Sequence, residues 1–361
     1  MRGATVPDIH TERQPMRTAR PIALASLAAT LLLVFACTAP GRRAPVATAP
    51  APAGDVRAAT RGLDMFGQQE LFKALTDVSF YTQLGGEMIL RKVRYDGEDK
   101  FVVPAYLFAP RDTTVRRPVI LMVHGGVHGD LDDQYVWQIR SLVSQGYVVV
   151  APEYRGSTGY GRAHYEAIDY GGKEVEDVML ARQYLGRFVP FADTSRTGLL
   201  GWSHGGHIAL HAALRRPEWF KVAVAHVPVA DLVSRMKSHS PAYRRIFSEQ
   251  PGFGGPVETH LENYVKRSPS SHARSLRVPL LVHAADNDDD VFIEENRTLR
   301  DSMVAAGKDR EGLYSYREWH DPPGGHAFSR IQTREGMESW TESIAFLRRY
   351  LHPEQPGAAS R

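Results

Sequence analysis

The sequence predicts an α/β fold, in which helices cover both faces of a mostly parallel β-sheet. Short apolar segments of strand length recur along the chain, and stretches with the periodicity of a half-buried helix separate them. In addition, the segment Leu-Leu-Gly-Trp-Ser-His-Gly-Gly at residues 199–206 joins a strand to a helix through a serine that glycines flank. The length of 361 residues and the 43% content of hydrophobic residues suit one domain with a sizeable core.

The first residues have the features of an export signal. Two arginines precede an apolar stretch at residues 22–36, which is short for a membrane span but typical of a signal peptide. Cys37 is the only cysteine of the chain, and the segment Val-Phe-Ala-Cys that it ends approximates a bacterial lipobox. We therefore expect residues 1–36 to be a signal peptide and Cys37 to carry a lipid. The alternative is an ordinary signal peptide that is cleaved beyond Cys37.

This leader sets the expected location and domain organisation. We expect an exported protein of the cell envelope, either an outer-membrane lipoprotein that contacts the membrane through its anchor or a periplasmic protein. Residues 37–62 are rich in alanine and proline, as in an extended tether, residues 63–353 form the folded domain, and residues 354–361 form a flexible tail. The formal net charge of +3 without a basic block argues against a nucleic-acid partner.

The folded domain begins with an amphipathic helical segment at residues 63–90. Strands are expected after it at 101–108, 118–123, 146–151, 197–202, 222–227, 278–283 and 312–318. Pro104 lacks the N–H that a ladder uses, so we expect the first of these strands near the edge of the sheet. The segment 232–275 is inserted between two strands, and we expect it to form a lid and a wall of the substrate pocket.

Ser203 is the candidate nucleophile. Gly-Trp-Ser-His-Gly at residues 201–205 fits the nucleophile elbow of the α/β-hydrolase fold, in which a serine lies on a strained turn between a strand and a helix. The backbones on either side of such a turn approach so closely that a Cβ would clash, which explains the flanking glycines. An apolar strand before the motif and an apolar helix after it favour this interpretation over an ordinary Gly-Ser turn.

His326 is the candidate general base. In this fold, the acid and then the histidine follow the serine along the chain. The alternating segment 313–319 is typical of a last strand, and a Pro-Pro-Gly-Gly loop behind it leads to His326. The chain has 15 histidines, so most of them have structural roles. His320 lies close by but precedes the loop.

The acid comes from the run Asp-Asn-Asp-Asp-Asp at residues 286–290. This run follows the strand at 278–283, and the carboxyl ends of parallel strands carry the functional groups of α/β proteins. The candidates are Asp286, Asp288, Asp289 and Asp290, one of which could instead cap the helix that begins near residue 292. The run could instead bind a divalent cation, but a metal site needs ligands that converge, and the hydrolase interpretation explains the run better. We therefore expect neither a metal site nor a cofactor.

The oxyanion hole is expected beside the strand at 118–123. That strand ends in His124-Gly125-Gly126, and esterases and lipases place an HGGG-type loop there whose N–H groups face the developing oxyanion. The second expected donor is the N–H of His204, the residue after the nucleophile.

Several motifs together resemble the prolyl oligopeptidase family of serine peptidases, in particular its dipeptidyl-peptidase and acylaminoacyl-peptidase branch. They are Tyr-Arg-Gly-Ser-Thr-Gly-Tyr-Gly at 154–161, the elbow, the His-Gly-Gly loop and Pro-Gly-Gly-His-Ala-Phe at 323–328, and residues 172–178 match the family's next helix. The resemblance covers roughly residues 95–350.

The resemblance implies further site residues. The family acid lies three residues before a valine, which selects Asp288, and the family places a tyrosine or histidine side chain beside the oxyanion at the position of His124. A substrate pocket would be formed by five residues: Tyr154, Trp202, Val229, Leu232 and Val291. Two departures from the family are visible. Between the tether and the first expected strand lie only about forty residues, which are too few for the family's β-propeller. In addition, no aromatic residue follows the step Pro228-Val229 until Tyr243.

The resemblance therefore implies a serine peptidase that cleaves peptide bonds through an acyl-enzyme. A carboxylesterase of the same fold, acting on ester substrates, is the alternative with the same chemistry. A surface-binding lipoprotein without catalytic activity is the alternative from another class, because a fold does not by itself determine function. The pattern of residues leaves the oligomeric state open.

Overall fold

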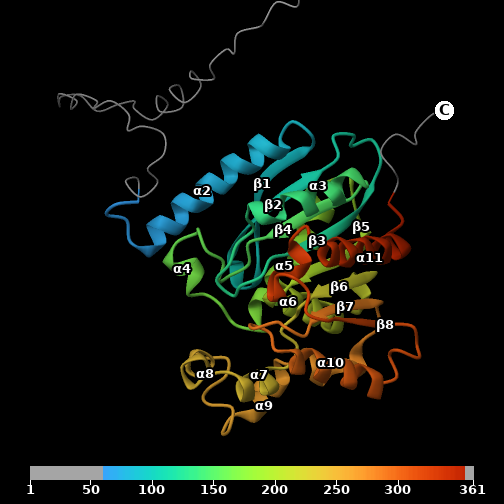
Figure 1. Cartoon of the computed structure of the whole chain (residues 1–361). Coiled ribbons are helices and arrows are strands. Elements are labelled where there is room, and N and C mark those ends of the chain that lie inside the picture. The colour runs from blue at the N-terminus through green and yellow to red at the C-terminus, as the bar shows by residue number, and fades with distance from the viewer. Residues whose placement is uncertain (1–59, 354–361) are drawn as a thin grey trace, which may run out of the picture. The chain divides into compact units, whose positions relative to one another are not determined.

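A computed structural model of the protein describes residues 60–353 (Figure 1). The expected signal peptide, the lipidation site Cys37, most of the expected tether and the expected tail lie outside the described residues. Within residues 60–353, no helix combines the length and the apolar character that crossing a bilayer requires.

The described residues are organised around one eight-stranded sheet with the order β1-β2-β4-β3-β5-β6-β7-β8. Neighbouring strands from β4 to β8 in this order pair in parallel, whereas β2 pairs antiparallel with both β1 and β4. The sheet is therefore mostly parallel, as the sequence predicts. The strands are β1 Ile89–Asp96, β2 Val102–Ala109, β3 Arg117–Val123, β4 Val148–Pro152, β5 Ala192–Trp202, β6 Val222–His226, β7 Leu280–Ala285 and β8 Tyr314–Trp319.

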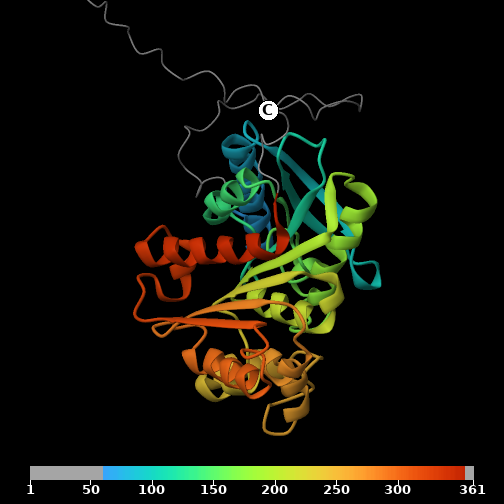
Figure 2. The ribbon, with the colours of Figure 1, turned by 90° about the vertical axis from the view of Figure 1, so that its right-hand side faces the viewer.

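Helices cover both faces of the sheet, and each face has its own apolar core (Figure 2). Helices α5 (Lys173–Phe188), α6 (His204–Arg215) and α10 (Ile293–Ala305) contribute to one core, and α2 (Met65–Leu84), α3 (Val136–Ser144) and α11 (Arg334–Leu351) contribute to the other. Along β3, Leu121 points into the first core and Ile120 into the second, which is the alternation expected of a strand that is buried on both sides.

The segment inserted between β6 and β7 is helical. It contains α7 (Leu232–Ser238), α8 (Pro241–Ser248) and α9 (Leu261–Lys266), which lie beyond the sheet near α10 (Figure 1). The remaining short helix, α4 (Arg162–Tyr165), and the 3-10 turns η1 (Glu98–Lys100), η2 (Asp133–Tyr135), η3 (Pro217–Trp219), η4 (Pro269–Ser275) and η5 (Gly325–Arg330) lie in the connections.

One expectation about the N-terminal part is wrong. The helix expected at 63–90 ends at Leu84, and a strand that was not expected, β1, follows it. This strand forms the edge of the sheet, and β2, which contains Pro104, lies beside it and therefore near the edge, as expected. Pro104 is tolerated inside the sheet because the pairing of β2 with β4 begins only at Ala105, so no ladder bond to β4 is lost at the proline.

Candidate active site

Ser203 lies on a strained turn between β5 and α6. Its backbone has φ 56° and ψ −120°, a combination that residues other than glycine rarely adopt. The Ser203 N–H donates to the carbonyl of His226 at 2.9 Å, and its own carbonyl accepts the N–H of His207 at 2.9 Å. These bonds hold the turn in place at the head of α6.

Glycine is required on either side of Ser203 because the neighbouring backbone leaves no room for a Cβ. A Cβ on Gly201 would lie 2.1 Å from the carbonyl oxygen of Gly205, and a Cβ on Gly205 would lie 2.2 Å from that of Val123. Backbone atoms cannot yield at such distances. The close approach that the sequence predicts at this turn is thereby confirmed.

His326 follows β8 in the turn η5, and its ring is held by one acid. Its Nδ1 lies 2.8 Å from Oδ2 and 3.0 Å from Oδ1 of Asp288, whose side chain is almost fully buried. Oδ1 of Asp288 also accepts the N–H groups of Asp290 and Val291, at 2.9 and 2.8 Å. Backbone bonds therefore fix the carboxylate, and the carboxylate holds the imidazole through Nδ1, so that Nε2 is the nitrogen left for proton transfer.

The other histidine and the other acids of the two loops lie elsewhere. His320 pairs with Asp286, but its side chain is 93% exposed and does not line the cavity that contains Ser203. Asp289 is exposed as well. None of the four acids caps the following helix, because α10 begins after Phe292 without a side-chain cap.

Asp290 also approaches the candidate base. Its Oδ2 lies 3.4 Å from Nε2 of His326, and its Oδ1 lies 3.2 Å from Nη2 of Arg235 on α7. Arg235 is in turn paired with the buried Glu295 at 2.8 Å. The inserted segment therefore contacts the site through Arg235, and a negative charge faces the nitrogen of the base that would receive the proton of the nucleophile.

The backbone around Ser203 offers two N–H donors. The His204 N–H belongs to the first turn of α6, where a helix supplies no acceptor of its own. Among the described residues no acceptor is recorded for the N–H of Gly126, which lines the same cavity as Ser203. The N–H of Gly125, in contrast, donates to the hydroxyl of Tyr135 at 3.3 Å. Of the two glycines expected in the oxyanion hole, only Gly126 has a free N–H.

The side chain of His124 does not face the cavity, contrary to what the resemblance implies. It is fully buried, and its Nδ1 and Nε2 lie 2.7 Å from the Gly125 carbonyl oxygen and 3.1 Å from the Ser157 hydroxyl. Nε2 also lies 3.2 Å from the carboxylate of Glu153, which pairs with Lys73 of α2. Although burial acts to raise it, Lys73 and His124 lower the pKa of Glu153 to about 2. The buried His124 side chain thus holds the glycine loop in place without facing the cavity.

Tyr135 is a candidate functional residue that the sequence analysis missed. It ends η2, is only 2% exposed, and lines the cavity together with Ser203 and His326. Burial raises the pKa of its hydroxyl above the ordinary value, so the group keeps its proton at neutral pH. The oxygen accepts from the Gly125 N–H and from the side chain of Arg330, so the O–H still has its own proton to donate.

The catalytic cavity, as we call this hollow, has a volume of about 300 Å³. Its lining comes from the glycine loop, η2, the turn after β7 and η5: Gly125, Gly126, Gly129, Asp130, Asp132, Tyr135, Ser203, Asp290, His326 and Arg330. No residue of 232–275 lines it, so the inserted segment does not form its wall. Within residues 60–353, no group of three or more His, Cys, Asp or Glu side chains is arranged to hold a metal ion.

None of the five expected pocket residues lines this cavity. Trp202 is fully buried in the core between the sheet and α11, because side chains alternate along β5 and this one points away from α6. Tyr154 is also buried, and its hydroxyl donates to the carbonyl oxygens of His124 and Gly125, both at 3.3 Å. The other three, Val229, Leu232 and Val291, pack with aromatic side chains of the insertion in a closed apolar cluster.

A buried carboxyl lies under the head of α6. Glu174 accepts the N–H groups of Gly171 and Gly172, and its Oε1 lies 3.5 Å from Nε2 of His204. Burial raises the pKa of Glu174 to about 7. Burial likewise lowers the pKa of His204 well below its ordinary value, so its ring is neutral.

This raised pKa predicts how stability depends on pH. The folded protein retains the Glu174 proton up to about pH 7, whereas the unfolded chain releases it near the ordinary glutamate pKa of 4.5. The folded state therefore binds more protons between these values, and the free energy of unfolding falls as the pH rises through that window. In Glu174→Gln the fall should be shallower, as measured by urea unfolding from about pH 5 to about pH 8. Equal slopes in the variant and the wild type would contradict the expectation, and the exposed Glu262→Gln serves as the control.

Comparisons with known proteins agree with this geometry. The model of the prolyl oligopeptidase family matches residues 133–354. An uncharacterized peptidase of Bacillus subtilis, YuxL, is 29% identical over 259 residues, which are 70% of this chain and 38% of that protein. The human acylamino-acid-releasing enzyme is 27% identical over 269 residues, which are 72% of this chain and 35% of that protein.

Solved structures show the same fold. A puromycin-hydrolyzing peptidase of Mycobacterium tuberculosis superposes with a TM-score of 0.63 and 28% identity, over 75% of this chain and 40% of that one. The chain spans less than half the length of each of these relatives. The family model covers more than half of the chain, including the elbow serine, the acidic turn and the histidine loop. The chain therefore belongs to the prolyl oligopeptidase family.

Proposed function

We propose that the protein is a serine peptidase in which Ser203 attacks the peptide carbonyl. His326 takes the hydroxyl proton through Nε2 and returns it to the leaving amine, while Asp288 holds the imidazole in the tautomer that this transfer requires. Water then hydrolyses the acyl-enzyme by the same route. One observation carries the proposal. The strained Ser203 lines the same cavity as His326, and a buried carboxylate holds Nδ1 of that histidine.

The oxyanion would be stabilised by three donors. Two are the N–H groups of His204 and Gly126, and the third is the hydroxyl of Tyr135, which lines the cavity whereas the side chain of His124 does not. Fixed donors in a site shielded from water stabilise the developing charge without reorganising. The relatives named above as peptidases and acylamino-acid-releasing enzymes support peptide substrates.

Tyr135→Phe should lower kcat by about 10- to 100-fold with little change in KM, because the lost donor acts mainly on the transition state. Steady-state kinetics on a peptide anilide measures this split. Tyr147→Phe is the matched control, since Tyr147 is also buried and its hydroxyl has no partner among the described residues. A rise in KM alone would instead assign Tyr135 to substrate binding.

Labelling and substrate comparison test the proposed activity. A fluorophosphonate probe should label the wild type and not Ser203→Ala, and an unlabelled wild type would leave only a non-catalytic role. Turnover is then compared on free dipeptidyl anilides, N-acetyl-aminoacyl anilides and short acyl esters. Faster cleavage of either anilide supports the peptidase and shows whether the substrate amino group is free or blocked. Turnover of esters alone would indicate a carboxylesterase.

We further propose that the protein is exported and anchored to the cell envelope through a lipid on Cys37. The support is the sequence alone: an apolar stretch at 22–36 that is followed directly by the chain's only cysteine. Cys37→Ala should abolish incorporation of radiolabelled palmitate and release the protein from the membrane fraction. A wild-type protein without lipid whose mature N-terminus lies beyond Cys37 would refute the anchor and leave the hydrolase proposal untouched.

A further inference from the structure

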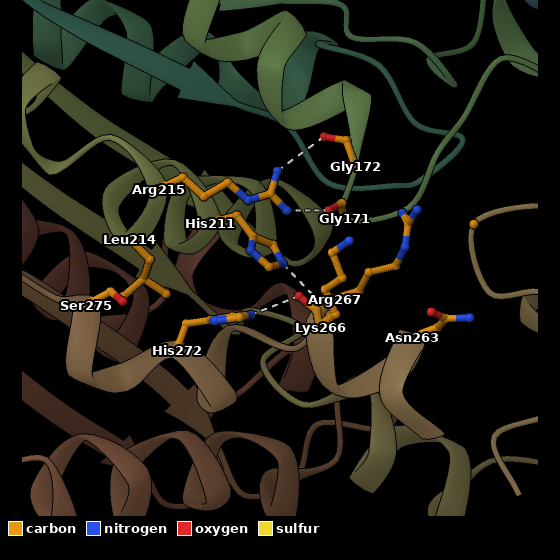
Figure 3. A pocket seen from close by; sticks show the side chains of 11 residues that line it. Gly171, Gly172, His211, Leu214, Arg215, Asn263, Lys266, Arg267, His272 and Ser275 are labelled. Atoms are coloured by element: carbon orange, nitrogen blue, oxygen red, sulfur yellow. Dashed lines mark hydrogen bonds between the residues drawn. The ribbon is translucent and has the colours of Figure 1, made fainter. Parts of the chain in front are cut away.

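A second, larger cavity lies at the other end of α6, about 510 Å³ in volume (Figure 3). It shares no lining residue with the catalytic cavity. Its walls are the end of α6, the Gly171–Gly172 turn that precedes α5, and the segment from α9 to η4. His211, which lines it, is eight positions after Ser203 on the strand-to-helix connection, or about 12 Å along the helix axis.

The lining of this cavity is basic. Arg215 of α6 and Lys266 and Arg267 at the end of α9 line it, and no aspartate or glutamate does. Arg267 is already paired, since its Nη1 lies 2.8 Å from a carboxylate oxygen of Asp169. Figure 3 shows Arg215 and Lys266 extending into the cavity from different walls. In the described part of the chain no carboxylate contacts Arg215 or Lys266, so these two cations favour a ligand of opposite charge.

Arg215 is positioned by neutral groups only. Its Nη2 and Nη1 donate to the carbonyl oxygens of Gly171 and Gly172, the latter at 3.4 Å, and among the described residues no carboxylate lies within 4.0 Å of it. A guanidinium has five N–H donors, so three of them remain available. Desolvation lowers the pKa of Arg215 from its ordinary value, although the carboxylates of Glu174, Glu176 and Asp169, which do not contact it, act to raise it.

Lys266 supplies a second uncompensated charge. Neither a hydrogen bond nor an ion pair engages its ammonium within residues 60–353. Only its backbone carbonyl is used, which accepts from His272 at 2.9 Å. The neighbouring His211 adds no charge, because burial lowers its pKa well below the ordinary value and its Nε2 contacts the Arg267 carbonyl oxygen at 3.0 Å.

We propose that this cavity binds a small oxyanion, a carboxylate or phosphate group, between Arg215 and Lys266. The planar guanidinium, held at one edge by two carbonyl groups, presents its remaining N–H groups in the arrangement that carboxylates and phosphates accept. The ammonium of Lys266 contributes a point charge from the opposite side. The site is separate from the proposed peptidase chemistry and does not depend on it.

Calorimetric titration of the full-length protein tests the site. Inorganic phosphate and acetate are titrated separately, with chloride keeping the ionic strength constant. Saturable binding of at least one anion is expected, and Arg215→Ala or Lys266→Gln should each weaken it by about tenfold. Arg216→Ala is the matched control, because Arg216 is exposed like its neighbour Arg215, lies over the ring of Trp219 and does not line the cavity.

Each outcome decides the proposal. Binding of phosphate alone assigns the site to phosphate-bearing ligands, binding of acetate alone assigns it to carboxylates, and binding of both assigns it to compact oxyanions in general. The proposal is overturned by the absence of saturable binding, by equal weakening in Arg216→Ala, or by loss of binding in Arg330→Ala, which would place the anion in the catalytic cavity. If Arg215→Ala does not fold, the exposed Lys266→Gln still decides the result.

Discussion

Ser203→Ala is expected to lower kcat/KM on a peptide anilide by about 10³- to 10⁶-fold. The variant keeps the cavity, the oxyanion donors and His326, but it loses the atom that forms the acyl-enzyme, so only binding and charge stabilisation remain. The fold should persist, because one methyl-sized group replaces a hydroxymethyl group on an unchanged backbone. Steady-state kinetics measures the loss of activity, and thermal unfolding tests whether the fold persists.

Two further variants make this prediction specific. Ser329→Ala removes another buried hydroxyl, one that lies in the same turn as His326 and has no partner among the described residues, and it should leave the activity near wild type. His326→Ala should be about as damaging as Ser203→Ala, and the double variant should be no worse than either, since the two residues act as a unit. A multiplicative loss in the double variant would show that they act independently.

Asp288→Asn is expected to lower kcat by about 10⁴-fold. The asparagine can still accept the N–H groups of Asp290 and Val291, so the turn is retained. Its amide, however, no longer provides the charge that holds the Nδ1–H tautomer of His326 and stabilises the imidazolium that forms during attack. Kinetics combined with thermal unfolding separates this loss from a loss of folded protein.

Asp286→Asn is the matched control for the acid. Asp286 belongs to the same loop and also pairs with a histidine, but that pair is exposed and does not line the catalytic cavity. Its removal should change kcat by less than about threefold. A larger effect of Asp286→Asn or of His320→Ala than of Asp288→Asn would mean that the acid and the base lie in the exposed pair.

The sequence predicts the parts of the site that local geometry dictates. The Gly201–Gly205 motif specifies a turn that only glycine flanks permit, and the strands 197–202 and 278–283 place Ser203 and the acidic run at the same edge of a parallel sheet. The choice among the four acids could not be made from the residues alone. That choice depends on which of the four carboxylates is directed toward His326 by the turn before α10. The family resemblance selected Asp288, and in the structure Asp288 is the acid that contacts Nδ1 of His326.

The features that the sequence did not predict depend on long-range contacts. In β1 half of the side chains are charged and exposed, so its apolar pattern is weak, and its strand form comes from pairing with β2. Tyr135 is separated from Gly125 by a loop without a motif, and only the fold brings its hydroxyl to the cavity. The pocket prediction failed at Trp202 because the motif fixes the backbone but not which core the neighbouring side chain joins.

The ion pair between Lys73 and Glu153 determines where the smallest working unit of this protein begins. Lys73 lies on α2, some sixty residues before the matched family segment starts at residue 133, yet its ammonium is buried and also contacts Asp130 at 2.9 Å and the Leu131 carbonyl at 2.7 Å. A fragment trimmed to that segment would lose both the glycine loop and this cation. Even a cut just after α2 would remove the ammonium that pairs with the buried Glu153 and leave only His124 and the Leu131 N–H beside the carboxylate, at a cost of about 3–5 kcal/mol. The N-terminal helix is thus an integral part of the catalytic unit, and a recombinant fragment designed from the family match alone would be cut in the wrong place.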